Sequence, residues 1–224
     1  MRINLPNQVT LGRLLLALLF FVLLSLHDAR DDPRWLLVVC FWVFLVAALG
    51  DVLDGMLARW LRQVTPFGRI VDPVVDKVLI CGAFILFASA NFVREGRNIT
   101  AVQPWMVIVI LARELLVSAI RAHAESAGES FGAHWAGKLK MFVQSATVCV
   151  ILGQLGWKLD GLAPLRVACV WLTVVVTALS VIAYFRRALV FLRTGAAPGP
   201  AERREPEVTP TPPPTAPQPR GLPR

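Results

Sequence analysis

Four aspartates stand at regular spacings in a stretch of the chain that is otherwise apolar. Asp51 and Asp54 are three residues apart, and Asp72 and Asp76 are four residues apart. On a helix, either spacing places both side chains on one face, so two facing helices would bring the four carboxylates together. Without partners, these groups would repel one another and take up protons. Hard divalent cations, which prefer carboxylate and phosphate oxygens, remove that repulsion. The spacing therefore predicts a metal site suited to phosphate chemistry.

The apolar surroundings make these acids more informative than acids on a soluble surface. A charged side chain inside a bilayer costs from about 2.5 to more than 10 kcal/mol, so such residues usually face a polar cavity and serve a function. Acids that merely hold helices together would need matching bases nearby, and the stretch supplies too few. An intramembrane ion site of a transporter is a further alternative. It is disfavoured because the chain shows no repeat and the acids lie at one edge of their apolar runs.

The composition indicates an integral membrane protein with several spans. The chain has 224 residues, of which 56% are hydrophobic and 17% are charged. Apolar runs long enough to cross a bilayer as helices recur along it. They cover roughly residues 9–27, 35–61, 69–92, 103–122, 135–156 and 164–190. We therefore expect an all-α integral membrane fold with six transmembrane helices, preceded by a short amphipathic segment at the N-terminus.

The composition changes abruptly near residue 195. Residues 195–224 hold ten of the sixteen prolines and almost no apolar side chain large enough to bury. Such a segment cannot form a core and is typical of disordered or polyproline-like tails. We expect a membrane domain over residues 1–193 and a disordered proline-rich tail over residues 194–224.

The basic residues between the predicted spans are unevenly distributed. Thirteen lie at the ends of the runs that carry the aspartates and the termini, and six lie at the opposite ends. The positive-inside rule then places the aspartates and both termini on the cytoplasmic side of a multi-pass protein of the cytoplasmic (inner) membrane. The net charge of +8 fits affinity for phosphate and anionic lipid. No nucleic-acid partner is expected, because the chain has no soluble basic module.

The residues around the aspartates complete a longer pattern, D-x2-D-G-x2-A-R-x8-G-x3-D-x3-D, which is matched at all eight fixed positions. This pattern resembles the signature of the CDP-alcohol phosphatidyltransferases, membrane enzymes of phospholipid synthesis. The resemblance implies two Mg²⁺ or Mn²⁺ ions in each active site, held by Asp51, Asp54, Asp72 and Asp76. It also implies that Asp76 is the general base on the incoming alcohol.

Small and polar residues beside the acids fit a bound nucleotide. Gly55 and Ala58 would let a bulky group approach the helix backbone, and the guanidinium of Arg59 suits a diphosphate. Thr65 lies in the connecting loop, where its hydroxyl could reach the nucleotide. By resemblance, the bulky group is the cytidine of CDP-diacylglycerol. The predicted binding residues for this substrate are Pro6, Asn7, Thr10, Asp51, Gly55, Ala58, Arg59, Thr65 and Gly68.

A second group of residues is basic and follows later in the chain. Arg113 and Arg121 are eight residues apart and therefore share a helix face, and Lys138 and Lys140 begin the next apolar run. Guanidinium and ammonium groups beside metal ions suggest a second substrate with its own phosphate. Anchoring to anionic lipid headgroups is the alternative. Glu114 is expected to pair with one of these bases.

Three further blocks narrow the resemblance to bacterial phosphatidylglycerophosphate synthases. They are residues 4–13 (NLPNQVTLGR), 112–121 (ARELLVSAIR) and 137–140 (GKLK), and Met141 stands where these enzymes commonly carry Thr. The resemblance implies transfer of the phosphatidyl group from CDP-diacylglycerol to sn-glycerol 3-phosphate, with release of CMP, by a homodimer in lipid. Other acceptors remain open, namely phosphatidylglycerol, an inositol phosphate or serine. So does a non-catalytic protein that kept the motif by descent.

Overall fold

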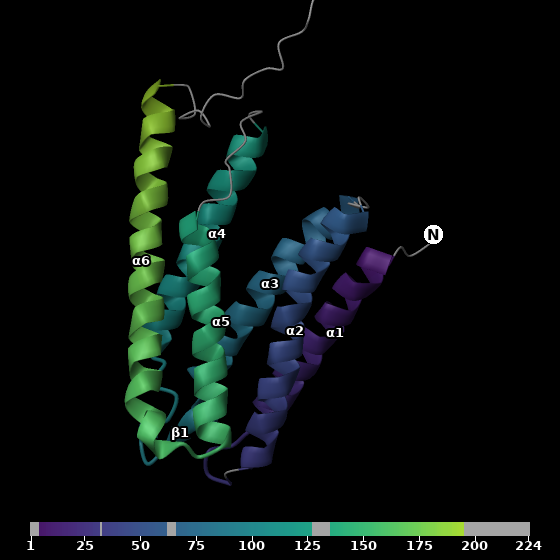
Figure 1. Cartoon of the computed structure of the whole chain (residues 1–224). Coiled ribbons are helices and arrows are strands. Elements are labelled where there is room, and N and C mark those ends of the chain that lie inside the picture. The colour runs from purple at the N-terminus through teal and green to yellow at the C-terminus, as the bar shows by residue number, and fades with distance from the viewer. Residues whose placement is uncertain (1–4, 32, 62–65, 127–134, 195–224) are drawn as a thin grey trace, which may run out of the picture.

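The computed structural model describes residues 5–31, 33–61, 66–126 and 135–194 (Figure 1). For residues 5–10, 51–61, 66–73, 121, 123–126, 135–138 and 183–194 it describes the backbone alone. The described residues form six long helices. These are α1 (Leu5–Ser25), α2 (Arg34–Leu61), α3 (Pro66–Phe87), α4 (Pro104–Ser126), α5 (Trp135–Gly156) and α6 (Ala163–Thr194). The predicted, mostly helical architecture is confirmed.

Successive helices run in opposite directions, so the first residues of α1 and the last residues of α6 lie at the same end of the molecule (Figure 1). We call this the motif end, because α2 and α3 carry the aspartates near it. The short connecting elements lie at the opposite end, which we call the hairpin end. They are the 3₁₀ helices η1 (Ala90–Phe92) and η2 (Asp160–Leu162) and the strands β1 (Val93–Arg94) and β2 (Arg97–Asn98).

The two strands form a small antiparallel hairpin in which Val93 pairs with Asn98 and Arg94 with Arg97. Glu95 and Gly96 make the turn between them, with φ values of 53° and 76°. A two-residue hairpin turn with positive φ at both positions matches the twist of its strands, and glycine adopts that conformation without strain.

The hairpin also closes the end of α3. The side-chain amide of Asn98 donates a hydrogen bond to the carbonyl oxygen of Phe87 (2.8 Å), and the hydroxyl of Thr100 donates to the same oxygen (3.0 Å). These bonds satisfy a carbonyl of the last turn that has no partner within the helix. The apolar run predicted to span residues 69–92 is therefore too long at its end: α3 stops at Phe87, and residues 90–92 form η1.

The core lies between the helices and is rich in phenylalanine. Phe20, Phe44, Phe84, Phe87 and Phe92 are each at most 1% exposed. Their rings meet at centroid distances of 5.5 Å for Phe20 with Phe44 and 5.6 Å for Phe87 with Phe92. Such tilted and edge-to-face pairs are favourable beyond the apolar area that they bury. They join α1, α2, α3 and η1 into one cluster.

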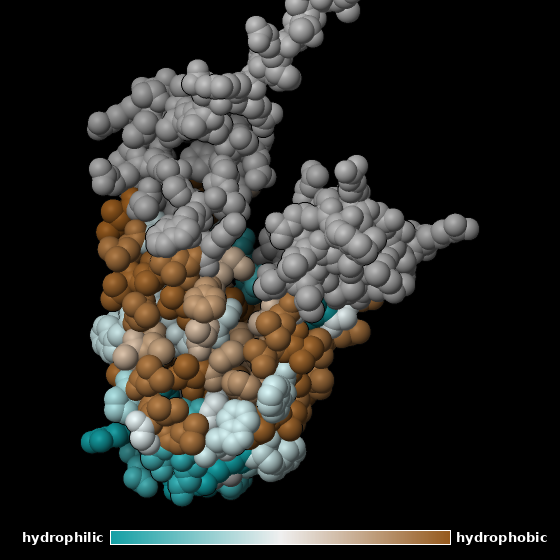
Figure 2. Space-filling model, viewed as in Figure 1, coloured by the Kyte–Doolittle hydropathy of each residue, from teal (hydrophilic) through white to brown (hydrophobic). Residues whose placement is uncertain are grey.

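Large apolar side chains also cover much of the outside of the bundle. Leu15, Ile108, Leu115, Phe142 and Leu179 are each more than half exposed. Figure 2 shows this apolar surface as a broad brown belt above a hydrophilic cap at the hairpin end. An exposed apolar belt of this extent marks a surface that meets lipid.

Helix length and composition identify fewer candidate membrane spans than the six predicted from the sequence. Among the described residues, two segments are long and apolar enough to cross a membrane, Leu139–Gly156 and Asp160–Ile182. Leu11–Ser25 and Arg34–Gly50 are shorter apolar helices. The molecule is thus membrane-associated, and the number of six spans stays a prediction.

The structure does not set apart an amphipathic segment before the first span. Residues 1–4 lie outside the described part of the chain, and from Leu5 onward the backbone belongs to α1 without a break. Pro6 does not interrupt the helix, because the N–H groups of the first turn have no partner within the helix in any case. The proline-rich residues 195–224 lie outside the described part, and α6 extends to Thr194, one residue past the predicted domain boundary.

Candidate active site

The aspartate motif lies on two helices that contact each other. Asp51 and Asp54 belong to α2, and Asp72 and Asp76 belong to α3, which follows after a short connection. Both stretches are helical, so the spacings of three and four place each pair of positions on one face, as predicted. The structure describes the backbone alone at Asp51, Asp54 and Asp72. Among the side chains that it does describe, no group of three or more potential metal ligands comes together.

Asp76 is the member of the motif whose side chain is described, and it is half-buried on α3. It lies close enough to Lys140 on α5 and to Cys81 on α3 to interact electrostatically with both. A carboxylate in this position, on a face shared with position 72 and next to α2, fits the chemistry of a divalent-cation site. It also connects the aspartate motif with the basic residues of later helices.

The predicted basic cluster centres on a buried carboxylate. Arg113 and Glu114 of α4 and Lys140 of α5 are 4%, 6% and 4% exposed. The Arg113 guanidinium donates through Nη1 to the two carboxylate oxygens of Glu114, at 3.3 and 3.4 Å, and Lys140 Nζ donates to Glu114 Oε1. Glu114 therefore pairs with both bases, where the sequence predicted pairing with one. Two cations share one carboxylate, so these three groups carry a net positive charge away from water.

A hydroxyl on α6 also holds Arg113, and no sequence pattern indicated this contact. Arg113 Nε donates to Ser180 Oγ at 2.8 Å, and that hydroxyl donates to the carbonyl oxygen of Thr177 at 2.7 Å. Arg113 and Ser180 are 67 positions apart, so nothing local links them. The bonds to Glu114 and Ser180 fix the plane of the guanidinium between α4 and α6.

A second connection of this kind links α3 to α4. Lys77, which directly follows Asp76, donates from Nζ to Ser118 Oγ at 2.6 Å. Ser118 in turn donates to the carbonyl oxygen of Glu114 at 2.6 Å. The sequence marks Lys77 only as a basic residue near the motif end. Its position beside Asp76 is the signal that would have selected it.

Arg13 is a further residue that the sequence did not select for the site. Its side chain is 3% exposed, and its Nε donates to the carbonyl oxygen of Ala47 at 3.3 Å. The same side chain lies against Gly50, where an added Cβ would come within 3.3 Å of Arg13 Cγ. Gly50 directly precedes Asp51, so Arg13 ties α1 to the segment of α2 from which the motif begins.

The remaining predicted residues are placed by their backbone alone. Gly55, Ala58 and Arg59 lie on the last turns of α2, and Gly68 lies in the first turn of α3. The other helical positions are Pro6, Asn7 and Thr10 on α1, Arg121 on α4 and Lys138 on α5. Thr65 lies outside the described residues. All the helices concerned bring these positions toward the motif end (Figure 1).

Comparison with known proteins gives the same assignment as the motif. The family model described as CDP-alcohol phosphatidyltransferase matches residues 3–179, which is most of the chain. A CDP-diacylglycerol–glycerol-3-phosphate 3-phosphatidyltransferase of Bacillus subtilis is 30% identical over 199 residues, covering 85% of this chain and 98% of the relative.

Two further relatives agree. A protein of the same name from Sodalis glossinidius is 33% identical over 183 residues, covering 76% of this chain and 89% of the relative. A probable phosphatidylglycerophosphate synthase of Mycobacterium tuberculosis is 34% identical over 181 residues, covering 80% of each chain. The family match spans every helix that carries the motif and the basic cluster, and the chain belongs to the CDP-alcohol phosphatidyltransferase family.

Proposed function

We propose that this protein transfers the phosphatidyl group of CDP-diacylglycerol to sn-glycerol 3-phosphate, giving phosphatidylglycerol phosphate and CMP. The names of the relatives support this reaction. The observation that carries it within the molecule is the proximity of Asp76, from the aspartate motif, to Lys140, from the buried basic cluster. A metal-binding motif beside an excess of cations suits a reaction in which both substrates carry phosphate.

Asp51, Asp54, Asp72 and Asp76 would hold two divalent cations, Mg²⁺ or Mn²⁺. When bound, such ions neutralise the charge on the attacking and leaving oxygens of an in-line displacement at phosphorus. The donor set fits, because four carboxylates at helical spacing on contacting helices match the oxygen ligands that these ions prefer.

The residues of the chain would supply position and proton transfer. A hydroxyl oxygen of glycerol 3-phosphate attacks the phosphorus that carries the diacylglycerol, and the bond from that phosphorus to the CMP oxygen breaks. Asp76 accepts the proton of the attacking hydroxyl. A carboxylate among other carboxylates holds a proton more readily than an isolated one, which suits it to act as a base near neutral pH.

The two substrates would bind to different helices. The CDP-diacylglycerol positions that the structure describes lie on α1, α2 and α3. Gly55 and Ala58 would leave room for the nucleotide, and Arg59 would meet the diphosphate. Arg113, Arg121, Lys138 and Lys140 would hold the phosphate of the acceptor. Glu114 and Ser180 position Arg113 for that role through the bonds described above.

The setting of the reaction is the cytoplasmic membrane, with the motif end and both termini on the cytoplasmic side. The basic asymmetry of the sequence and the placement of both ends of the bundle at the motif end support this orientation. We further propose that the active protein is a homodimer with six spans in each subunit.

An acceptor panel tests the reaction. Purified protein would be given CDP-diacylglycerol, Mg²⁺ and one acceptor at a time: glycerol 3-phosphate, phosphatidylglycerol, an inositol phosphate or serine, with CMP release as the readout. We expect release with glycerol 3-phosphate. Faster release with another acceptor would contradict the proposal while leaving the family assignment intact.

Asp51→Asn, Asp54→Asn and Asp72→Asn should abolish turnover, because an amide cannot supply an anionic ligand.

Steady-state kinetics with each substrate varied separately test which residues bind which substrate. Arg113→Ala and Lys138→Ala should raise the KM for glycerol 3-phosphate far more than the KM for CDP-diacylglycerol. Loss of one charge-assisted contact of about 1.5–3 kcal/mol corresponds to a fall of about 10- to 150-fold in kcat/KM. Arg97→Ala, a change of the same kind at the hairpin end, is the matched control and should leave both constants unchanged. If both basic variants affect CDP-diacylglycerol alone, the cluster serves the nucleotide.

A further inference from the structure

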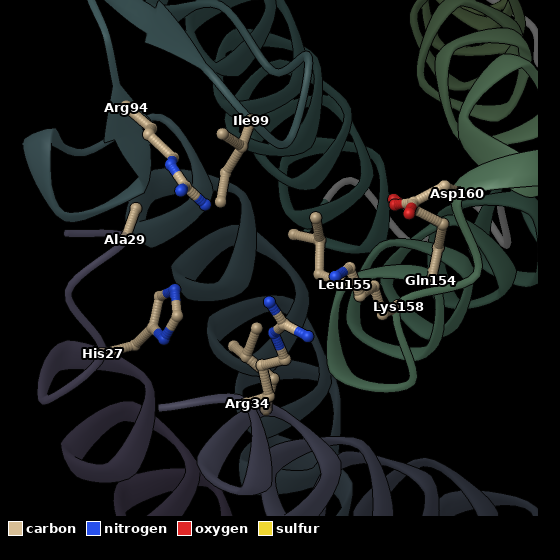
Figure 3. Close-up of a pocket in the computed structure, with 10 residues that line it drawn as sticks. His27, Ala29, Arg34, Arg94, Ile99, Gln154, Leu155, Lys158 and Asp160 are labelled. Atoms are coloured by element: carbon tan, nitrogen blue, oxygen red, sulfur yellow. The ribbon is translucent and has the colours of Figure 1, made fainter. Parts of the chain in front are cut away.

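A polar pocket opens at the hairpin end, which is the opposite end of the bundle from the aspartate motif. It is lined by residues of the α1–α2 connection, the start of α2, the hairpin, the end of α5 and the α5–α6 connection, and its volume is about 150 Å³. That is room for several water molecules. Its polar lining residues are His27, Arg34, Arg94, Gln154, Lys158 and Asp160 (Figure 3).

The pocket gathers positive charge from separate elements. Arg34 begins α2, Arg94 lies on β1, and Lys158 lies between α5 and η2. Figure 3 shows the guanidinium groups of Arg34 and Arg94 directed toward the centre of the pocket from different sides. Among the lining residues, Asp160 carries the carboxylate, so the fixed charges are three positive and one negative. Three of the six basic residues at this end therefore converge on one cavity.

The pocket walls are held in place by contacts within the fold. His27 is 1% exposed, and its ring packs against that of Phe92 in a tilted arrangement at a centroid distance of 4.8 Å. Gln154 is 5% exposed and accepts a hydrogen bond from Arg166, which brings a fourth cation against the wall. The backbone N–H of Ala29 donates to the carbonyl oxygen of Asn91 at 2.8 Å and so joins the α1–α2 connection to η1. These contacts hold the His27, Ala29 and Gln154 parts of the pocket wall in place.

Tryptophans place the pocket at the level of lipid headgroups. Trp35 directly follows Arg34 and is 68% exposed, and Trp157 directly precedes Lys158 and is 44% exposed. Trp105, at the start of α4, is 46% exposed. Exposed tryptophans at one end of a membrane protein mark the interface between hydrocarbon and water. The pocket therefore lies where the phosphate of a lipid in the adjacent leaflet would be.

We propose that this pocket binds the phosphate of an anionic lipid headgroup in the leaflet opposite the aspartate motif. Arginine and lysine are the side chains that hold phosphate oxygens, and the N-terminus of α2, at Arg34, adds a favourable dipole. The site takes a phosphate as a ligand and performs no reaction. It is independent of the catalytic proposal, because none of its lining residues belongs to the motif or the basic cluster.

Lipid-dependent thermal stability of the full chain in mixed detergent micelles tests the site. We expect phosphatidylglycerol to raise Tm more than zwitterionic phosphatidylcholine does. The double variant R94Q/K158Q should lose at least half of this difference. R97Q, which removes an exposed arginine of the same hairpin outside the pocket, should keep it, and R94K should keep most of it. An undiminished difference in R94Q/K158Q, or an equal loss in R97Q, would overturn the proposal.

Two further measurements distinguish a lipid phosphate from free phosphate and show that a lost response is not caused by misfolding. Inorganic phosphate alone is the second arm, and a rise in Tm that depends on Arg94 and Lys158 in the same way would make a free anion the ligand. D160N should enlarge the response to phosphatidylglycerol, because it removes the carboxylate of the pocket. A misfolded protein cannot produce that gain, so an unchanged or smaller response in D160N would also overturn the proposal.

Discussion

At the scale of single residues, one buried carboxylate, that of Glu114, holds the basic side chains of the site in place. Glu114 sits between Arg113 and Lys140, and all three are almost fully buried. Removing one member of a buried ionic group leaves charge without compensation, which costs far more than the group contributes as a whole. Glu114 therefore holds the two cations that the proposed acceptor phosphate would meet.

We expect Glu114→Gln to lower the free energy of unfolding by about 3–5 kcal/mol, because two buried cations lose their carboxylate. The double variant Glu114→Gln with Lys140→Met should be more stable than Glu114→Gln alone, since one of those cations is removed as well. Chemical denaturation of the solubilised protein measures both, and a double-mutant cycle extracts the coupling. Glu95→Gln, at the exposed hairpin turn, is the matched control and should stay within about 0.5 kcal/mol. Strictly additive effects would rule out the shared pairing.

At the scale of helices, small residues and hydroxyls set how closely the elements approach. Thr147 of α5 and Thr173 of α6 are hydrogen-bonded at 2.8 Å across their interface. Gly156, at the end of α5, lies so near the start of α2 that an added Cβ would be 3.2 Å from the backbone nitrogen of Val38. Gly153, one turn earlier, has room for a Cβ, with its nearest neighbour at 3.5 Å. Such close contacts are typical of helices packed in membranes.

These two glycines give a matched pair of variants. Gly156→Ala should destabilise the protein by about 1–3 kcal/mol, because the α2 backbone cannot move aside as a flexible side chain would. Gly153→Ala should be neutral or stabilising, since alanine favours the helix by up to about 1 kcal/mol and fits the space. The Tm values of the two variants, measured in the same detergent, test this difference in stability. Equal values would show that the α2–α5 contact tolerates a wider separation.

At the scale of the whole molecule, the two ends carry different chemistry. The motif end combines the aspartates, the buried basic cluster and both ends of the bundle. The hairpin end carries the cationic pocket and the exposed Trp35, Trp105 and Trp157. An apolar belt separates them (Figure 2). We expect the two ends to face opposite sides of the membrane.

Cysteine labelling tests this arrangement in the membrane. In a chain with its native cysteines replaced by alanine, Glu95→Cys and Gly195→Cys should react with an impermeant thiol reagent from opposite sides. Asp31→Cys, in the α1–α2 connection at the hairpin end, is the control and should behave like Glu95→Cys. Labelling of Glu95→Cys and Gly195→Cys from one side would refute the topology.

Much of this molecule could be predicted from its sequence, because the deciding features are local. Long apolar runs yield the helices, and spacings of three and four place Asp51 with Asp54 and Asp72 with Asp76 on shared faces. The family follows from eight residues at fixed offsets, and the family match confirms it. The end of α3 was predicted wrongly, because apolar residues continue into η1 and only the bonds from Asn98 and Thr100 end the helix at Phe87.

The tertiary structure alone decided which side chains meet across helices. Spacing fixes the face on which a residue lies, but the neighbour of that face depends on how the helices pair. The bonds from Arg113 to Ser180, from Lys77 to Ser118 and from Arg13 to Ala47 join positions 67, 41 and 34 residues apart. The cationic pocket has the same origin: its bases come from the start of α2, the hairpin and the α5–α6 connection, which the antiparallel order of the helices brings to one end.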